Sequence, residues 1–312
     1  MITVLGAGVA GLCAATALAE AGHRLRVVQP AGVAPVSLLA GGMIAPWCEG
    51  ETAPAAVTDR GRAALDWWRA RAASFQGRGT LVIAPARDGA ELDRFARDTT
   101  GHHWVDPGDL EPALAGRFAR ALFFAEEGHL DPAEALDGLR AGLAARGVGF
   151  LDHLPDDATT VIDCRGLAAR DMLPDLRAVR GETALVDAPD VGLTRTVRLL
   201  HPRFPCYIVP RGQGRFLIGA TMVESDDDGP ITARAVVELL SAAYTVDPAF
   251  GQARLIAKAA GLRPAFPDNL PALRHEGGRI HVNGMYRHGF LMAPVLAADL
   301  VAALHKGIAY AH

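Results

Sequence analysis

The stretch MITVLGAGVAGLCAATALAEAGHRLRVVQP (residues 1–30) decides the fold. The short apolar run at 2–5 predicts a buried strand, and the run at 24–28 predicts a second one. Between them, the alanine- and leucine-rich stretch 9–21 predicts a helix that ends at Gly22. Strand, helix and strand in this order predict a βαβ unit, with which a Rossmann-like α/β fold begins.

The turn between the first strand and the helix has the pattern GxGxxG. Gly6 permits a tight turn, Gly8 lets the backbone approach a pyrophosphate, and Gly11 lets the helix pack closely on the strand. The first helical N–H groups, those of Val9 and Ala10, lie at the positive end of the helix dipole and suit phosphates. We expect all five residues to bind a dinucleotide; the alternative is a tight turn without a ligand.

Gln29 stands where a carboxylate usually ends the second strand and accepts hydrogen bonds from the adenosine ribose. An amide oxygen still accepts such a bond but carries no charge, so we expect a weaker ribose contact. Residues 30–37 contain no arginine that could pair with a 2′-phosphate, which argues against NADP. A second glycine-rich segment at 38–46 and the stretch VIDCRG at 161–166 favour FAD over NAD.

Composition excludes other classes of function. The chain has 312 residues, is 50% hydrophobic and has a formal net charge of −4 without a block of Lys or Arg, which excludes nucleic acid and anionic membrane as partners. We find no secretory signal and no apolar stretch of the ~20 residues that a membrane span needs. The four cysteines are far apart, so we expect no disulfide framework, no metal site and a cytoplasmic location: Cys13, Cys48, Cys164 and Cys206.

The order of the remaining patterns predicts a fold in two interleaved parts. Strand and helix patterns of the α/β kind occur at both ends of the chain and in its middle, with antiparallel-looking strands between them. We therefore predict a discontinuous FAD-binding domain at 1–75, 126–180 and 256–312. A mixed or antiparallel sheet at 76–125 and 181–255 would form the substrate domain.

Four further helices are predicted outside the opening βαβ unit, and the last is the apolar helix that ends the stretch 277–307, after a strand and a tight turn. The other three have clearer limits. They lie at 58–73, 131–146 and 232–246. The second has the clearest beginning, because Asp131 is a good N-cap residue and Pro132 suits the first helical position.

Eight motifs follow one another along nearly the whole chain: VLGAGVAGL, AGGMIAP, VIDCRG, VRGE, CYIVPR, GRFLIGATM, GLRPAFPDNLP and GMYRHGFLMAP. In this order they resemble the D-amino-acid oxidase family of flavoproteins, and within it the glycine oxidases of thiazole (thiamine) biosynthesis. The resemblance implies non-covalently bound FAD and a small amino acid as substrate.

The resemblance also implies roles for particular residues. Arg263 and Tyr207 would hold the substrate carboxylate, Arg287 would lie near the flavin, and Met222 would form the wall of the side-chain pocket. Further cofactor contacts would come from the hydroxyl of Ser37, from the glycine-rich loop and from N–H groups at the last helix: Gly41, Gly42, Met43, His288, Gly289, Phe290 and Leu291.

The residues themselves leave alternatives open. Arg263 precedes Pro264, which favours an extended backbone suited to a bidentate carboxylate clamp, but it could instead pair with an acid such as Asp268. Tyr207 could be a half-buried core tyrosine. Arg287 could lie in a surface turn.

We therefore expect FAD-dependent oxidation of glycine through the imine to glyoxylate, with O2 reduced to H2O2, in the service of thiazole synthesis. One alternative is a related flavin oxidase or dehydrogenase acting on D-alanine, D-proline or sarcosine. Another is a non-catalytic relative without flavin, which the loss of the acid at position 29 suggests. We also expect that the chain could form a homo-oligomer.

Overall fold

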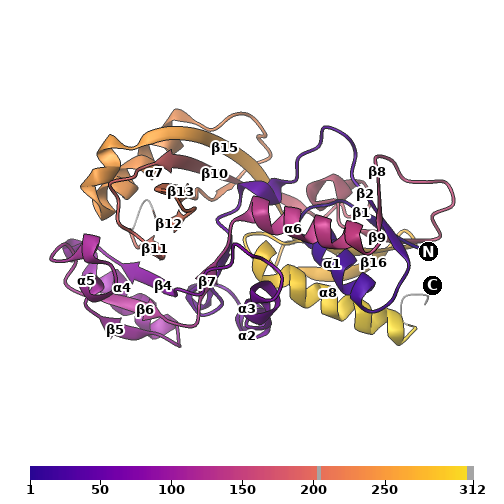
Figure 1. Cartoon of the computed structure of the whole chain (residues 1–312), viewed down its shortest axis with the longest axis horizontal. Helices are drawn as coiled ribbons and strands as arrows, with labels where there is room; N and C mark the ends of the chain where they lie inside the picture. Colours follow the sequence, from indigo (N-terminus) through magenta and orange to yellow (C-terminus); the bar gives the residue numbers. More distant parts are fainter. Residues whose placement is uncertain (202–204, 308–312) are drawn as a thin grey trace.

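The computed structural model describes residues 1–201 and 205–307. It contains two large sheets, each covered by helices, in two lobes that lie side by side (Figure 1). Both ends of the described chain lie in the same lobe, around the six-stranded sheet.

The six-stranded sheet has the order β16-β17-β9-β1-β2-β8 and is parallel except for the β16–β17 pair. Its strands come from three separate parts of the chain, as a discontinuous domain requires. Both strands of the predicted βαβ unit are present, with β1 at the centre of the sheet. The strands are β1 (Ile2–Leu5), β2 (Leu25–Val28), β8 (Gly149–Leu151), β9 (Thr160–Asp163), β16 (Ala272–Glu276) and β17 (Arg279–Asn283).

Three long helices belong to this lobe: α1 (Val9–Glu20), α6 (Pro132–Ala145) and α8 (Gly289–His305). Helix α1 packs against both α6 and α8, so nine of its residues are buried and it has no solvated face of any width. The predicted beginning of α6 is confirmed. Asp131 accepts hydrogen bonds from the N–H groups of Ala133 and Glu134, at 2.8 and 3.2 Å, and Pro132 is the first helical residue.

The prediction of a single helix at 58–73 is wrong. Two short helices take its place, α2 (Ala55–Gly61) and α3 (Ala63–Arg69). They separate after Gly61, whose missing side chain lets helix α8 approach, since a Cβ there would lie 2.5 Å from Cγ of Leu291. A glycine also weakens a helix interior.

The nine-stranded sheet forms the other lobe and has the order β14-β10-β13-β12-β11-β4-β6-β5, with β15 paired to β10. All its pairs are antiparallel except β4 with β11, so the sheet is mixed. The strands are β4 (Thr80–Ile83), β5 (His103–Val105), β6 (Ala121–Phe124), β10 (Arg177–Asp187), β11 (Thr196–Leu199), β12 (Cys206–Pro210), β13 (Arg215–Gly219), β14 (Val223–Glu224) and β15 (Arg254–Ala265).

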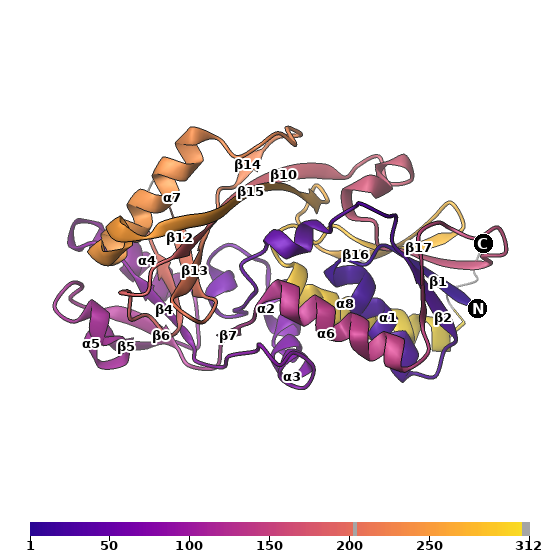
Figure 2. The ribbon, with the colours of Figure 1, turned by 45° about the horizontal axis from the view of Figure 1, so that its top comes forward.

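Strands β10 and β15 are the longest of the sheet and pair along their whole length. Figure 2 shows them running together from the nine-stranded lobe toward the six-stranded one. The predicted domain boundaries after residues 180 and 255 fall inside these two strands. The domain limits themselves stay a prediction.

The remaining elements are short, apart from α7 on the nine-stranded sheet. Helix α7 was predicted at 232–246, and Thr232 caps it by accepting the N–H of Ala235 at 3.1 Å. No helix within the two described ranges has the length and apolar character needed to cross a membrane. These elements are α4 (Gly89–Asp98), α5 (Pro107–Leu110), α7 (Ala233–Val246), β3 (Met43–Ile44), β7 (Gly128–His129) and the 3-10 helices η1 (Val36–Leu39), η2 (Cys48–Glu51), η3 (Ala86–Asp88), η4 (Pro112–Leu114), η5 (Gly166–Asp171) and η6 (Pro248–Gln252).

Candidate functional site

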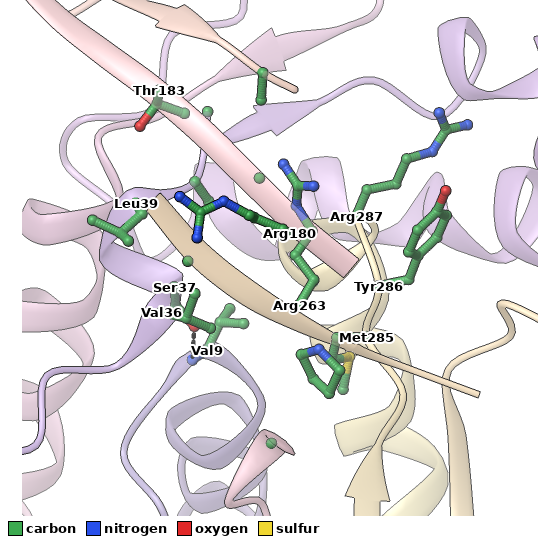
Figure 3. A pocket seen from close by; sticks show the side chains of 18 of the residues that line it. Val9, Val36, Ser37, Leu39, Arg180, Thr183, Arg263, Met285, Tyr286 and Arg287 are labelled. Carbon is green, nitrogen blue, oxygen red and sulfur yellow. Dashed lines mark hydrogen bonds between the residues drawn. The ribbon is translucent and has the colours of Figure 1, made fainter. Parts of the chain in front are cut away.

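A cavity of about 900 Å³ is lined by residues of both sheets. Its walls come from the β1–α1 turn, η1, strands β10, β12 and β15, and the turn before α8. Figure 3 shows part of this lining. The volume is in the range of small-molecule and cofactor sites, and the position at the carboxyl ends of parallel strands is where α/β sheets bind ligands.

The glycine turn lies at one end of the cavity and has the close contacts that the motif predicts. Gly6 has a φ of +96°, and a Cβ there would lie 2.6 Å from the carbonyl oxygen of Cys164. A Cβ on Gly11 would lie 1.8 Å from the carbonyl oxygen of Gly6, so only glycine fits. The turn therefore brings its backbone to the cavity. Gly6, Gly8, Val9 and Ala10 line the cavity, whereas Gly11 lies beneath the turn.

Ser37 lies directly at the start of helix α1. Its Oγ accepts the N–H of Val9 at 3.0 Å (dashed in Figure 3). A hydroxyl that accepts one bond still has its own O–H to donate. Ser37, the N–H of Ala10 and the positive end of the α1 dipole together fit the diphosphate of a dinucleotide.

At the next part of the cavity the structure differs from expectation, because an arginine lies beside Gln29. The amide of Gln29 donates to the carbonyl of Val33 at 2.9 Å and accepts a hydrogen bond from the guanidinium of Arg140 on helix α6. The same guanidinium lies 4.6 Å from the ring centroid of Phe150. Residues 30–37 supply no arginine, but the fold brings one from α6. The position where a carboxylate usually ends the second strand therefore has a neutral amide with a positive charge beside it.

The glycine-rich loop carries Gly41, Gly42 and Met43, which all line the cavity. Gly42 has a φ of +68°, and a Cβ there would lie 2.2 Å from the carbonyl oxygen of Leu130. The buried guanidinium of Arg211 donates to the carbonyl of Gly41 at 2.9 Å. These contacts fix the backbone of the loop against the cavity.

At the start of α8 the four predicted contacts divide into two pairs. Gly289 and Phe290 line the cavity, and as the first two helical residues they have N–H groups without an intrahelical acceptor. His288 and Leu291 do not line the cavity, and their N–H groups already donate to the carbonyls of Met285, at 2.8 Å, and His288, at 3.0 Å. The predicted donor role toward the cofactor therefore rests on Gly289 and Phe290.

Helix α8 contains Pro294, which has no N–H to donate to the carbonyl four residues earlier, that of Phe290. The fully buried Trp68 on α3 donates its indole N–H to this carbonyl at 2.7 Å instead. Sequence analysis missed this contact, which anchors the end of α8 that faces the cavity.

Arg263 extends from β15 into the other end of the cavity, between Arg180 and Arg287 in the view of Figure 3. Its guanidinium lies over the backbone of Gly181, where a Cβ would be 2.1 Å from Nη2. It donates to the carbonyl of Thr221 at 3.3 Å. Gly181 belongs to the VRGE motif, but its role as the residue that makes room for Arg263 is visible only in the structure.

Arg263 differs from the other arginines that line the cavity. Among the residues that the structure describes, no carboxylate lies within ion-pair distance of it, so it is not paired with Asp268. The other five lining arginines each form an ion pair: Arg165 with Asp163 (2.7 Å), Arg180 with Glu182 (3.1 Å), Arg198 with Glu51 (2.5 Å), Arg234 with Glu238 (2.6 Å) and Arg287 with Glu49 (3.0 Å).

Tyr207 and Met222 line the same end of the cavity. The Tyr207 ring lies between two glycines, since a Cβ would be 2.8 Å from the ring at Gly41 and 2.7 Å from the hydroxyl at Gly219. Its hydroxyl has no hydrogen-bond partner within the described ranges, and burial raises the pKa of this phenol, although Arg263 acts in the opposite direction. Met222 is 55% exposed, and its sulfur accepts a hydrogen bond from the hydroxyl of Tyr286, with 2.7 Å between oxygen and sulfur.

Arg287 lines the cavity but is paired. Its Nη2 lies 3.0 Å from Oε2 of Glu49 and also donates to Thr52. The ring of His288 lies 3.3 Å from the same carboxylate oxygen. Burial raises the pKa of Glu49, but Arg287 and His288 outweigh it and lower the pKa to about 2, so Glu49 is an anion at neutral pH.

Sequence analysis missed Glu49, which also lines the cavity. The only sequence signal is its place three residues after the glycine-rich segment 38–46. Glu49 lies in η2, and a second acid holds this element, since fully buried Glu127 accepts the N–H of Cys48 at 2.7 Å. Burial raises the pKa of Glu127 to about 7, although the bond from Cys48 acts in the opposite direction.

Comparisons with known proteins agree with this arrangement. Residues 1–304 match the model of a family described as FAD dependent oxidoreductase (DAO). A putative thiamine biosynthesis oxidoreductase, ThiO, of Rhizobium etli is 53% identical, over 97% of this chain and 96% of its own. A glycine oxidase of Geobacillus kaustophilus is 27% identical, over 96% of this chain and 92% of its own.

A solved structure shares the fold. The crystal structure of a glycine oxidase from Bacillus cereus superposes with a TM-score of 0.82 at 21% identity, covering 98% of this chain and 95% of that one. The predicted α/β class is confirmed, with its Rossmann-like cofactor domain and interleaved mixed sheet. The roles of individual site residues stay predictions.

Proposed function

Because the chain belongs to the family of FAD-dependent oxidoreductases, we propose that it oxidises glycine to the imine, which water converts to glyoxylate and ammonia. FAD is its cofactor and, when bound, supplies the acceptor for the hydride that leaves the substrate. Molecular oxygen would take the two electrons and become H2O2. The reaction would supply thiazole synthesis for thiamine.

The observation that carries the proposal is the unpaired guanidinium of Arg263. A cation that is half-buried in a cavity and lacks an anionic partner in the described protein suits a carboxylate ligand. The free hydroxyl of Tyr207 would donate a second hydrogen bond to the same carboxylate. Together, Arg263 and Tyr207 would fix the orientation of an α-amino acid, which is the main task of a protein around a redox cofactor.

Two relatives support the choice of substrate and pathway. The Rhizobium etli protein carries a thiamine biosynthesis name at 53% identity, and the Geobacillus kaustophilus protein is named glycine oxidase. None of the four cysteines lies in the C-terminal motifs, so we infer that FAD is bound without a covalent link. The cytoplasmic location and a homo-oligomeric state remain sequence-based proposals.

Anaerobic mixing of the FAD-loaded protein with glycine tests the proposal. We expect loss of the flavin's visible absorption, recovery of this absorption in air, and formation of peroxide and glyoxylate. The Arg263→Ala protein should keep its FAD and lose the reaction. If the wild-type protein is yellow and glycine does not change its spectrum, the assignment of glycine as the substrate is wrong.

A second candidate function is oxidation of a D-amino acid or a secondary amine such as D-alanine, D-proline or sarcosine. It is favoured by Met222, which is 55% exposed and bonded only through its sulfur to Tyr286. A side chain or N-methyl group could displace such a wall at low cost. A comparison of kcat/KM for these three substrates with kcat/KM for glycine separates the two functions.

A further inference from the structure

Glu49 is the one acid that faces the substrate end of the cavity from η2, and its carboxylate is incompletely bonded. Oε2 of Glu49 lies 3.0 Å from Arg287 and 3.3 Å from His288, yet neither contact has the alignment of a hydrogen bond. Nε of Arg287 and Nδ1 of His288 are likewise buried without a hydrogen-bond partner. A purely structural ion pair would satisfy these atoms within the protein.

The charges at this end of the cavity can be counted from these contacts. Arg263 keeps a free positive charge, and the charge of Arg287 is balanced by Glu49. The Glu49 carboxylate is 19% exposed and Arg287 22% exposed, so water screens the pair only in part. Without Glu49, the cavity would contain two unpaired guanidinium groups, on β15 and on the turn before α8.

We propose that Glu49 determines substrate charge: by neutralising Arg287, it restricts the site to amino acids with one carboxylate and rejects those with a second anionic group. The inference rests on the proposed function in that the ligand is an amino acid held by Arg263. A substrate with two carboxylates would bring its second charge toward the anionic Glu49. Glycine, with a single carboxylate, meets no such repulsion.

The inference also explains why an arginine that lines the cavity is not a second carboxylate clamp. Nη2 of Arg287 lies against the Glu49 carboxylate and donates to Thr52, so a carboxylate ligand at this guanidinium would lie next to an existing negative charge. Arg287 then contributes shape rather than charge to the site. Removal of the Glu49 charge alone would turn it into a clamp.

The test measures binding and not turnover, so it does not depend on which amino acid is oxidised. The FAD-loaded protein is titrated with acetate and with malonate, and the change in the visible flavin spectrum gives each Kd. For Glu49→Gln we expect malonate to bind at least about tenfold more tightly than to wild type, since one charged hydrogen-bonded contact is gained. Acetate binding should change less than about threefold.

Three further variants make the result specific. Glu91→Gln makes the same change at an acid of α4 that pairs with Arg94, at 2.8 Å. Neither residue lines the cavity, so this variant should leave both Kd values unchanged. Arg287→Met leaves Glu49 without its partner and should weaken acetate binding. The double variant Glu49→Gln/Arg287→Met should lose the gain for malonate.

Equal weakening of acetate and malonate by Glu49→Gln, with FAD retained, would show that Glu49 only supports the fold and would overturn the inference. An unchanged malonate Kd would overturn it as well. If Glu49→Gln fails to fold, a normal acetate Kd in Arg287→Met contradicts the inference. Glu49→Gln could bind malonate more tightly although glycine does not reduce the flavin of the wild-type protein. That result would uphold the inference and reject only the assignment of glycine as substrate. For turnover, kcat/KM for iminodiacetate relative to glycine should rise in Glu49→Gln through a lower KM.

Discussion

Each end of the cavity has an arginine, and the partners of the two differ. Arg140, which sequence analysis missed, lies behind the lining residue Gln29, and Arg287, which it predicted, lines the other end. At the adenosine end, Arg140 is bound by the neutral amide of Gln29, so its positive charge remains. At the substrate end, Arg287 is bound by the carboxylate of Glu49, so its charge is cancelled. The number of arginines at a site therefore says little about the charge that a ligand meets. The partner of each arginine decides it.

The largest expected effect comes from Arg263, the one described arginine in the cavity lining that has neither a side-chain amide nor a carboxylate as partner. We expect Arg263→Ala to lower kcat/KM for the amino-acid substrate by about 10³-fold, or about 4 kcal/mol, because a buried charge contact is lost. Steady-state peroxide production measures this, and the visible spectrum checks that FAD is still bound. Arg263→Lys should recover part of the loss. Equal activities of Arg263→Ala and wild type would remove the basis of the charge argument.

The same contrast between paired and unpaired charges separates two buried acids. Glu49 has an arginine as partner, whereas Glu127 has none in the described chain. Its pKa is about 7 in the folded protein and 4.5 as the ordinary value, so the folded state binds this proton more tightly. The resulting stability is fully present below pH 4.5 and is lost as the pH rises to about 7. At 1.36 kcal/mol per pKa unit this amounts to about 3 kcal/mol.

Urea unfolding at pH 5 and pH 8 measures this effect. The free energy of unfolding should fall less between these pH values in Glu127→Gln than in wild type, because glutamine does not titrate. Glu126→Gln alters the exposed neighbour and should behave as wild type. If the free energy of unfolding depended on pH in the same way in Glu127→Gln and wild type, the pKa of Glu127 would not be raised in the folded protein.

At the adenosine end, Arg140→Ala should weaken FAD binding by about tenfold, since the amide of Gln29 loses its donor and the site loses its charge. Fluorescence titration of the apoprotein with FAD gives this value, and the KM of the fully loaded enzyme should not change. Arg146→Ala, at the exposed end of the same helix, is the matched control. If Arg140→Ala changed KM and left FAD binding unchanged, Arg140 would belong to the substrate end of the cavity and not to the adenosine end.

The smallest effect is expected where the missing acid is restored. Gln29→Glu places a carboxylate at the end of β2 that can accept from both Arg140 and a ribose hydroxyl. We expect FAD affinity to rise by about threefold, measured by the same titration, because a charged acceptor is modestly stronger than an amide. Weaker binding in Gln29→Glu would mean that the free charge of Arg140 is itself needed by the cofactor.

What the sequence could predict depends on how locally each feature is encoded. The glycine turn and the cap at Asp131 involve neighbours along the chain, so their patterns were sufficient. Arg140 reaches Gln29 across 111 positions, and Arg287 reaches Thr52 across 235, so no spacing rule reveals either pair.

Contacts between distant parts of the chain also explain one wrong prediction and one missed element. Tertiary packing divides the helix predicted at 58–73, because Gly61 lies against α8. Strand β15 was missed because its sequence, RLIAKAAGLRPA, has few β-branched residues, and its pairing with β10 supplies what propensity lacks.

The bond from Trp68 to the carbonyl of Phe290 has a consequence for how this protein and its relatives can diverge. Pro294 creates an acceptor without a partner, and Trp68 supplies the missing donor from a distant helix. A change of Pro294 to alanine would restore the helical N–H and free position 68 to vary. Loss of Trp68 while Pro294 remains would leave a buried carbonyl unpaired. The two positions should therefore be inherited as a pair, each replaced only in chains where the other has changed.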